Sequence, residues 1–189
     1  VAMGPDPEPW ELTWVGPGRI ECARAGVLVA GFCDVTGSAY RTDVEWLASI
    51  GVTVGCRPER FCPDDPITRG DAASMLWRLF GAPPADPSTP FADVYESDPW
   101  GVAVGWLWRE GLVTGRTADA FAPTVALTAE EALALLVRLG TAEGLPEPTG
   151  LSGSVTLPAM PADGVGEVGL SLSRAEFAAI LHRWVAGVT

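Results

Sequence analysis

The chain has 189 residues and is 48% apolar, which is enough to bury a hydrophobic core, either as one domain or as small repeats packed together. Its 12 basic residues face 24 acidic ones, and the formal charge of −12 argues against nonspecific binding to nucleic acid. No apolar run reaches the roughly 20 residues of a membrane-spanning helix, so no insertion into a membrane is expected.

The N-terminal segment, residues 1–31, has no helical period and predicts an irregular extension. Four cysteines in a chain with one histidine suit disulfides better than a metal site, because C-x-x-C and Cys/His spacings are absent. Cys56 and Cys62 flank a stretch short enough to close on itself, which makes Cys22 and Cys33 the second pair, although three connectivities remain open. Disulfides indicate an oxidising, extracellular setting, and neither a metal nor a cofactor is expected.

From residue 32 onward the sequence repeats itself after about sixty residues. "FCDV" at 32–35 recurs as "FADV" at 91–94, and "EWLASIGVTVG" at 45–55 aligns with "GWLWREGLVTG" at 105–115. The match continues through a Phe-x-Pro element into a helix start. Six landmarks recur in order: Trp46, Gly51, Gly55, Phe61, Pro63 and Thr68 become Trp106, Gly111, Gly115, Phe121, Pro123 and Thr128.

Each repeat predicts two helices joined by a loop bounded by glycines. The expected helices cover residues 41–50 and 69–80 in a first repeat at 32–85, and residues 100–110 and 129–139 in a second repeat at 91–140. Residues 141–189 are expected to be an insertion, with short strands such as 154–157, followed by a degenerate third repeat. That third repeat keeps only a helix near 172–184, and the whole chain is expected to form one compact unit.

The second helix of each unit opens with a hydroxyl residue followed three positions later by an acid, a capping-box arrangement. These pairs are Thr68 with Asp71, Thr128 with Glu131, and Ser173 with Glu176.

Two helix starts also carry an arginine, Arg69 and Arg174, where the helix dipole disfavours a cation. Both lie in line with the apolar stripe of their helix, so we expect them at the places where repeats meet. Two interpretations stay open. Each arginine forms a salt bridge with a carboxylate of another repeat, or each forms an anion clamp together with the helix N-terminus.

The pattern F-x-D-V, helix, G-x-x-x-G, F-x-P and [IL]-[TS]-R-x-[DE] resembles the S-layer homology (SLH) family of cell-surface anchoring modules. The resemblance covers residues 32–140 well and 172–184 in part. It implies a mainly α fold in which three repeats form a pseudo-threefold bundle with short β decorations. It also implies grooves between repeats that bind an anionic secondary cell-wall polysaccharide, often through a pyruvylated sugar.

Carried onto this sequence, the resemblance implies glycan contacts from the motif arginines, their acidic companions and the loop glycines. The second repeat has Ala129 in place of the arginine. The implied residues are Arg69, Arg174, Asp71, Glu131, Glu176, Gly55 and Gly115.

Trp46 and Trp106 point away from the apolar row of their helices and are candidates for a glycan-stacking platform, with packing against a neighbouring repeat as the alternative. His182 is expected to face water, which leaves no histidine for a nucleophile–base pair, so no enzymatic activity is expected.

The sequence therefore predicts a secreted, noncatalytic module at the extracellular cell surface that binds an anionic cell-wall polysaccharide. The alternative is a structural subunit of a surface assembly or filament, in which the same fold contacts other surface-protein subunits. The arginines discriminate between the two functions: anchoring requires spare guanidinium groups, whereas internal salt bridges favour the scaffold. On the clamp hypothesis, Arg69→Ala is expected to weaken binding to wall polymer without unfolding the protein.

Overall fold

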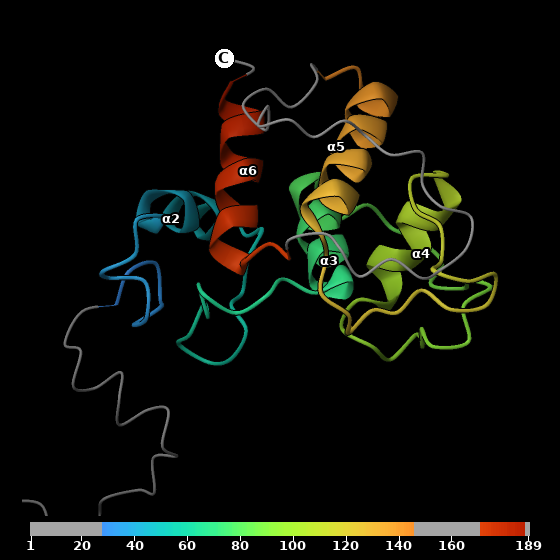
Figure 1. The fold of residues 1–189 in the computed structure, drawn as a ribbon, viewed down its shortest axis with the longest axis horizontal. Coiled ribbons are helices and arrows are strands. Elements are labelled where there is room, and N and C mark those ends of the chain that lie inside the picture. Colours follow the sequence, from blue (N-terminus) through green and yellow to red (C-terminus); the bar gives the residue numbers. More distant parts are fainter. Residues whose placement is uncertain (1–27, 146–170, 188–189) are drawn as a thin grey trace, which may run out of the picture.

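The computed structural model describes residues 28–145 and 171–187, which contain five helices and no strands (Figure 1). Residues 1–27, the predicted strand at 154–157 and Cys22 lie outside the described residues. The helices are α2 (Arg41–Ser49), α3 (Arg69–Leu79), α4 (Gly101–Arg109), α5 (Ala129–Glu143) and α6 (Arg174–Ala186). The mainly α prediction is confirmed. None of the described helices is long and apolar enough to cross a bilayer.

Helix boundaries follow the predicted cap residues closely, with one exception. Helix α5 was expected to end at residue 139, but it continues to Glu143 and ends at Gly144, which adopts the left-handed conformation with φ of 68°. Glycine adopts positive φ without steric cost and so commonly terminates helices. Gly140, which follows the expected end of the helix, is instead a buried residue inside α5.

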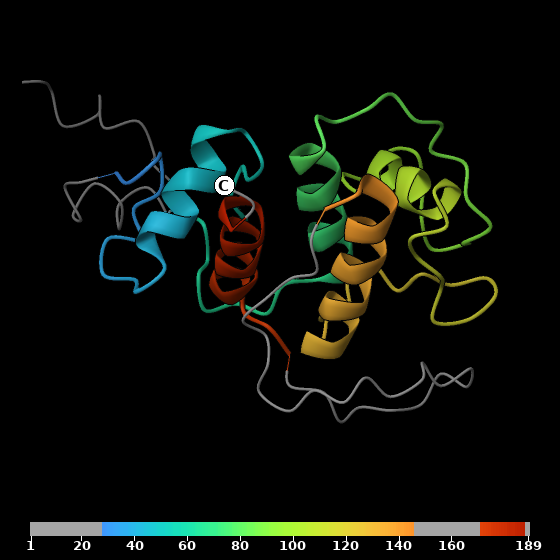
Figure 2. The same cartoon turned by 90° about the horizontal axis from the view of Figure 1, so that it is seen from above.

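The helices pack in pairs that cross the boundaries of the repeats. Helix α4, the first helix of the second repeat, packs on α3 of the first repeat, and α2 packs on α6. Figure 2 shows α2 beside α6 on one side of the molecule, and α3, α4 and α5 together on the other. No repeat therefore buries its apolar faces alone, which is the usual reason that repeats of this size fold only in company.

A closed ring of three backbone hydrogen bonds joins the segments that precede three of the helices. The N–H of Ile67 donates to the carbonyl of Leu172 at 2.9 Å, that of Leu127 to Ile67 at 2.8 Å, and that of Leu172 to Leu127 at 3.2 Å. Each of these residues directly precedes the N-cap of a helix, namely α3, α5 and α6. The ring thus fixes the starting points of three helices relative to one another.

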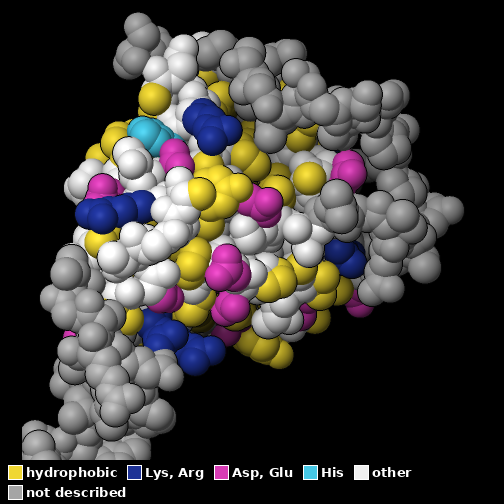
Figure 3. Space-filling view, turned by 60° about the vertical axis from the view of Figure 1, so that its left-hand side comes forward, with side chains coloured by type: hydrophobic (Ala, Val, Ile, Leu, Met, Phe, Trp, Pro, Cys, Tyr) yellow, Lys and Arg dark blue, Asp and Glu magenta, His cyan; other side chains and the backbone are white. Residues whose placement is uncertain are grey.

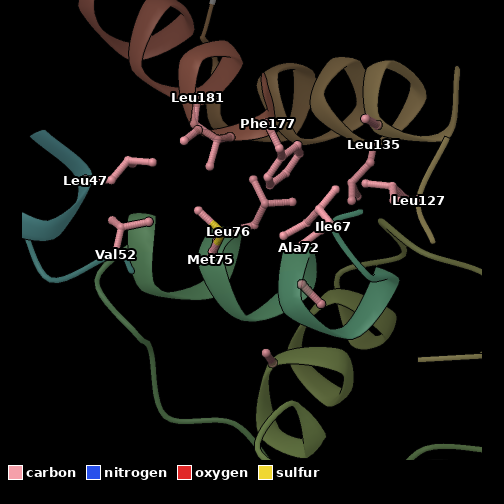
Figure 4. Packing of buried hydrophobic residues seen from close by; sticks show 14 of the residues in the cluster. Leu47, Val52, Ile67, Ala72, Met75, Leu76, Leu127, Leu135, Phe177 and Leu181 are labelled. Atoms are coloured by element: carbon pink, nitrogen blue, oxygen red, sulfur yellow. The ribbon is translucent and has the colours of Figure 1, made fainter. Parts of the chain in front are cut away.

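Side chains from all three of these segments meet in one hydrophobic core (Figure 4). Ile67, Leu76 and Phe177 are fully buried, and Leu127 is 3% exposed. Because Ile67 and Leu127 also belong to the backbone ring, the same residues supply both the polar and the apolar connections between the repeats.

The aspartate of each F-x-D-V element holds the F-x-P loop of its own repeat. The carboxylate of Asp34 accepts hydrogen bonds from the backbone N–H groups of Phe61 and Cys62 at 2.9 and 2.8 Å. Asp93 accepts from Phe121 and Ala122 in the same way, at 2.8 and 2.7 Å. Two elements almost thirty residues apart in each repeat are thereby locked together, and the Phe side chains are turned into the core.

The helix caps are present, but they are not equivalent. Thr128 with Glu131, and Ser173 with Glu176, form complete capping boxes. At α3 only half of the box forms: the hydroxyl of Thr68 accepts from the N–H of Asp71 at 3.1 Å, and the Asp71 carboxylate does not return to the Thr68 N–H. The prediction of a reciprocal box at Thr68 is therefore wrong, because the shorter Asp71 side chain is engaged elsewhere.

Truncation of the core where α6 meets α3 tests how far the third segment contributes to folding. We expect Phe177→Ala to lower the free energy of unfolding by about 3–5 kcal/mol, since the cavity cannot be filled by its close-packed neighbours. Urea denaturation measures the change. The matched control is Val54→Ala, at a side chain that is 66% exposed, and we expect it to change stability by no more than about 0.5 kcal/mol. Equal effects of the two variants would show that α6 does not share the core.

Candidate functional site at the junctions between repeats

Arg69, the first residue of α3, reaches across to the second repeat with its whole guanidinium group. Its Nε donates to the carbonyl of Phe121 at 2.9 Å, Nη1 to Oε1 of Glu131 at 2.9 Å, and Nη2 to the carbonyl of Thr114 at 3.2 Å. The guanidinium carbon also lies 4.6 Å from the centroid of the Phe121 ring, a cation–π distance. We call this set of residues the Arg69 junction.

Arg174, the first residue of α6, makes the corresponding contacts with the first repeat. Its Nε donates to the carbonyl of Phe61 at 2.9 Å and Nη1 to Oδ2 of Asp71 at 2.8 Å, and the guanidinium carbon lies 5.3 Å from the Phe61 ring centroid. The residue is 4% exposed. We call Arg174, Phe61 and Asp71 the Arg174 junction.

The backbone N–H groups at the starts of α3 and α6 are also used internally. Arg69 and Gly70 donate to the carbonyls of Val125 and Pro123, at 2.9 and 2.8 Å. Arg174 and Ala175 donate to Asp65 and Pro63, at 2.9 and 3.1 Å. The orphan donors of a helix N-terminus, which often bind anions, are here satisfied by the F-x-P loop of the adjoining repeat.

Of the two interpretations left open for these arginines, the structure shows the salt bridge between repeats. Both arginines lie between repeats, as their helical phase predicted, and each is neutralised by a carboxylate of the adjoining unit. Burial lowers the pKa of Arg69, opposed by Glu131 and reinforced by the like charge of Arg116. Burial also lowers the pKa of Arg174, opposed by Asp71 and by two further aspartates. An ion pair of this kind is costly to break, since removal of one partner leaves a poorly solvated charge.

In the part of the chain that the structure describes, no arginine junction of this kind joins the second repeat to α6. Ala129 occupies the position of the missing arginine, and Glu176 accepts a hydrogen bond from the N–H of Ser173 as part of its own cap. Within residues 28–145 and 171–187, no cation pairs with Glu176. Among the described residues, guanidinium groups therefore connect the units at two places, the Arg69 junction and the Arg174 junction.

The loop glycines Gly55 and Gly115 are required for close packing. A Cβ on Gly115 would overlap the carbonyl oxygens of Thr117 and Ala120, and would lie 2.7 Å from Cε1 of Phe91. A Cβ on Gly55 would similarly overlap the carbonyl oxygen of Arg60 and lie 2.6 Å from the Phe32 ring. Their structural role is thus to let the loop close over the phenylalanine of F-x-D-V.

The two candidate tryptophans differ in exposure. Trp106 is only 8% exposed and has its ring centroid 6.0 Å from that of Phe80. Trp46 is half-buried and stacks on His182, with the two ring centroids 4.7 Å apart. Packing between units, the alternative foreseen for these residues, accounts for both positions.

His182 does not simply face water as predicted. Its Nδ1 lies 2.8 Å from Oδ1 of Asp43, and its ring stacks on Trp46, so it ties α6 to α2. Helical phase placed His182 on the polar side of α6, but phase alone could not show that α2 covers that side.

Among the described residues, the cysteine pairing agrees with the favoured connectivity. Cys56 and Cys62 form a disulfide that closes the loop leading into the first F-x-P element, in which Cys62 is the middle residue. Cys33 is disulfide-bonded as well, and Cys22, its predicted partner, lies outside the described residues. No group of three or more potential metal ligands occurs in the described part of the chain.

One charged residue at the Arg69 junction was missed by sequence reasoning. Nη2 of Arg116 lies 3.5 Å from Oε1 of Glu131, the same oxygen that Arg69 contacts, and the Arg116 side chain is 37% exposed. The signal was the residue that follows the second glycine of G-x-x-x-G, which is Arg116 in the second repeat and Cys56 in the first. The family pattern F-x-D-V to [IL]-[TS]-R-x-[DE] does not include this position.

Two segments of the chain, residues 31–73 and 90–133, match the S-layer homology domain. The chain thus contains two S-layer homology domains, and each spans its F-x-D-V element, first helix, glycine loop, F-x-P element and the start of its second helix. Domains of this family typically anchor surface proteins to a cell-wall polysaccharide. A comparison with curated proteins finds no match to the chain.

The contacts of Arg69 predict that removal of its side chain lowers the stability of the fold. We expect Arg69→Ala to lower the free energy of unfolding by about 3 kcal/mol, because Glu131 and the Phe121 carbonyl lose their partner in a poorly solvated place. Denaturation in urea measures this, with Arg41→Ala as control. Arg41 forms an exposed ion pair with Glu45 on one helix, and its removal should cost no more than about 0.5 kcal/mol. A stability of Arg69→Ala equal to that of the control would contradict the structural role.

A methyl group at Gly115 should also destabilise the fold, because the nearest obstacles are backbone oxygens that cannot move aside. We expect Gly115→Ala to cost about 2 kcal/mol or more. Gly37→Ala is the matched control, since a Cβ there meets nothing within 4 Å, and it should be neutral to within about 0.5 kcal/mol. Comparable unfolding midpoints for both variants would remove the packing explanation for this glycine.

Proposed function

We propose that this protein is a noncatalytic module that attaches a surface protein to the cell envelope by binding an anionic cell-wall polysaccharide in grooves between its repeats. The observation that carries the proposal is the pair of S-layer homology domains, residues 31–73 and 90–133. The Cys56–Cys62 disulfide supports an extracellular location, since such bonds persist in oxidising compartments.

We further propose that residues 171–187 are the remnant of a third repeat and that the three units form a pseudo-threefold bundle. The closed ring of Ile67, Leu127 and Leu172 supports this, because three aligned positions make the same hydrogen bond in cyclic order. Arg174 supports it too, since it contacts the first repeat as Arg69 contacts the second. The incomplete third unit limits the grooves to two.

The groove residues carried over from the family divide into framework and contact groups. Arg69, Arg174, Asp71 and Glu131 bind one another across the junctions. In the proposal they shape the grooves, and the sugar contacts come from groups beside them. Framework residues are poor probes of glycan binding, because their removal perturbs folding first.

The second candidate function is a structural subunit of a surface assembly, with the fold serving as a protein scaffold. The observation that favours it is the internal pairing of both motif arginines, which leaves neither of them as a spare clamp. Under this alternative the protein would contact other surface-protein subunits and would not retain wall polysaccharide.

Co-sedimentation with purified wall sacculi from the source organism separates the two functions. We expect the protein to pellet with intact sacculi and to remain soluble with sacculi whose secondary polysaccharide has been stripped by hydrofluoric acid. Equal pelleting with both preparations would point to peptidoglycan, and no pelleting with either would favour the scaffold. The wild-type chain is used throughout, so no loss of folding confuses the result.

A further inference from the structure

We infer that the two arginine junctions are functionally unequal, and that Arg116 is the residue that binds the acidic group of the wall polysaccharide at the Arg69 junction. The inference rests on the proposed anchoring function and names the anion-binding group within it. The Arg174 junction, in contrast, only holds the fold together.

The two junctions share a framework, which makes their differences informative. In both, an arginine donates through Nε to a phenylalanine carbonyl and through Nη1 to an acid, while its guanidinium lies over the phenylalanine ring. Two aligned positions beside the guanidinium groups differ in charge: Cys56 corresponds to Arg116, and Asp65 corresponds to Val125. The loops also differ at Arg57, Arg60 and Asp64, which are Thr117, Ala120 and Thr124 in the second repeat.

Each of these two differences makes the Arg69 junction one charge more positive. Three aspartates lie around Arg174. Asp71 pairs with its guanidinium, and Asp34 holds the loop that carries the Phe61 carbonyl, to which Arg174 donates. The backbone carbonyl of Asp65 accepts from the Arg174 N–H. The charges that act on the Arg174 guanidinium are thus three carboxylates. An anionic ligand would be repelled there.

At the Arg69 junction two cations face two carboxylates. Arg69 and Arg116 both contact Glu131, and Asp93 holds the loop that supplies the Phe121 carbonyl. Val125 adds no charge. The local balance is therefore neutral in a molecule whose overall charge is −12, and an incoming anion meets no net repulsion at short range.

Arg116 has more hydrogen-bonding capacity within reach of a ligand than Arg69, which makes three hydrogen bonds and has a side chain only 11% exposed. In the described residues its one interaction is the 3.5 Å ion pair with Oε1 of Glu131. Glu131 is already engaged, since Oε1 accepts from Arg69 at 2.9 Å and Oε2 from the N–H of Thr128 at 3.0 Å. A guanidinium has five N–H donors in a planar fork that suits a carboxylate or a phosphate. The Arg116 side chain, 37% exposed, can offer that fork to a ligand.

The remaining negative charge does not prevent such binding. Charges beyond about 8–10 Å are largely screened at moderate salt, so only nearby groups decide. On the face drawn in Figure 3, basic side chains lie scattered among acidic and hydrophobic ones and form no single basic patch. At the Arg69 junction, recognition of an anion is expected to depend on the one contact that Arg116 offers. The ligand class is a carboxylate or phosphate group borne by a glycan.

The test compares arginine variants in the sacculus assay, with apparent Kd as the readout. Arg116→Ala is expected to raise the apparent Kd by about tenfold or more, the usual order for loss of a charge-assisted hydrogen bond. Its thermal midpoint should stay within about 2 °C of the wild type, because the side chain is half-exposed. Arg116→Lys keeps the charge and loses the planar fork of donors, so its apparent Kd should lie between those of the wild type and Arg116→Ala.

Two control variants change the same charge elsewhere. Arg109→Ala removes an arginine of the same repeat that is 36% exposed and pairs with Asp86 at 2.7 Å. Arg57→Ala removes an exposed arginine of the disulfide-closed loop beside the Arg174 junction. Both should bind sacculi within about twofold of the wild type, as expected when only screened, distant charge is altered.

The possible results separate the inference from the function on which it rests. Wild-type binding that survives in Arg116→Ala, or that falls equally in Arg109→Ala or Arg57→Ala, overturns the inference and leaves anchoring intact. Absence of wild-type binding overturns both. Carbodiimide-mediated reduction of the carboxyl groups on the sacculi identifies the acid: binding that depends on Arg116 is lost if the ligand is a carboxylate and retained if it is a phosphate.

Discussion

The fold depends on one repeated interaction, a guanidinium at the start of one helix that is tied to an acid at the start of another. The guanidinium is buried at Arg174 and largely buried at Arg69. Arg69 binds Glu131 and Arg174 binds Asp71, in each case together with a phenylalanine carbonyl of the adjoining repeat. Burial of an unpaired arginine would be prohibitive, so each arginine is stable only when the next unit is in place. The polar contacts therefore specify how the units assemble, while the hydrophobic core provides most of the driving force.

This arrangement explains why a cation stands where the helix dipole disfavours one. The first turn of α3 loses some electrostatic stability with Arg69, but the acid three residues into α5 lies within 2.9 Å and offsets that loss. The capping acid thus has two tasks. Glu131 completes its own cap through Oε2 and receives Arg69 through Oε1. Asp71 is too short for both tasks and gives up the cap, which is why α3 begins with half a box.

The same constraint separates the groups that build the junctions from those that can act there. A side chain that is fully engaged in holding two units together has no donors left for a ligand. Function at such a junction must come from residues added at its edge, where sequence varies between repeats without disturbing the framework. Arg116 and Cys56 occupy the same aligned position beside the framework, and one supplies an exposed cation while the other closes a disulfide.

The local structure could be predicted from the sequence alone: the repeat, the helix starts at Thr68, Thr128 and Ser173, and the S-layer homology pattern. The Cys56–Cys62 pair was favoured among three possible connectivities. Each of these depends on residues near in the chain or on spacing alone. The partners of individual side chains emerge only from the tertiary structure. Contacts between units far apart in sequence settle three points: what Arg69 binds, what covers His182 and which tryptophan is buried. Helical phase gives the direction of a side chain but not what lies opposite it, and the charge of a junction emerges only when both of its sides are assembled.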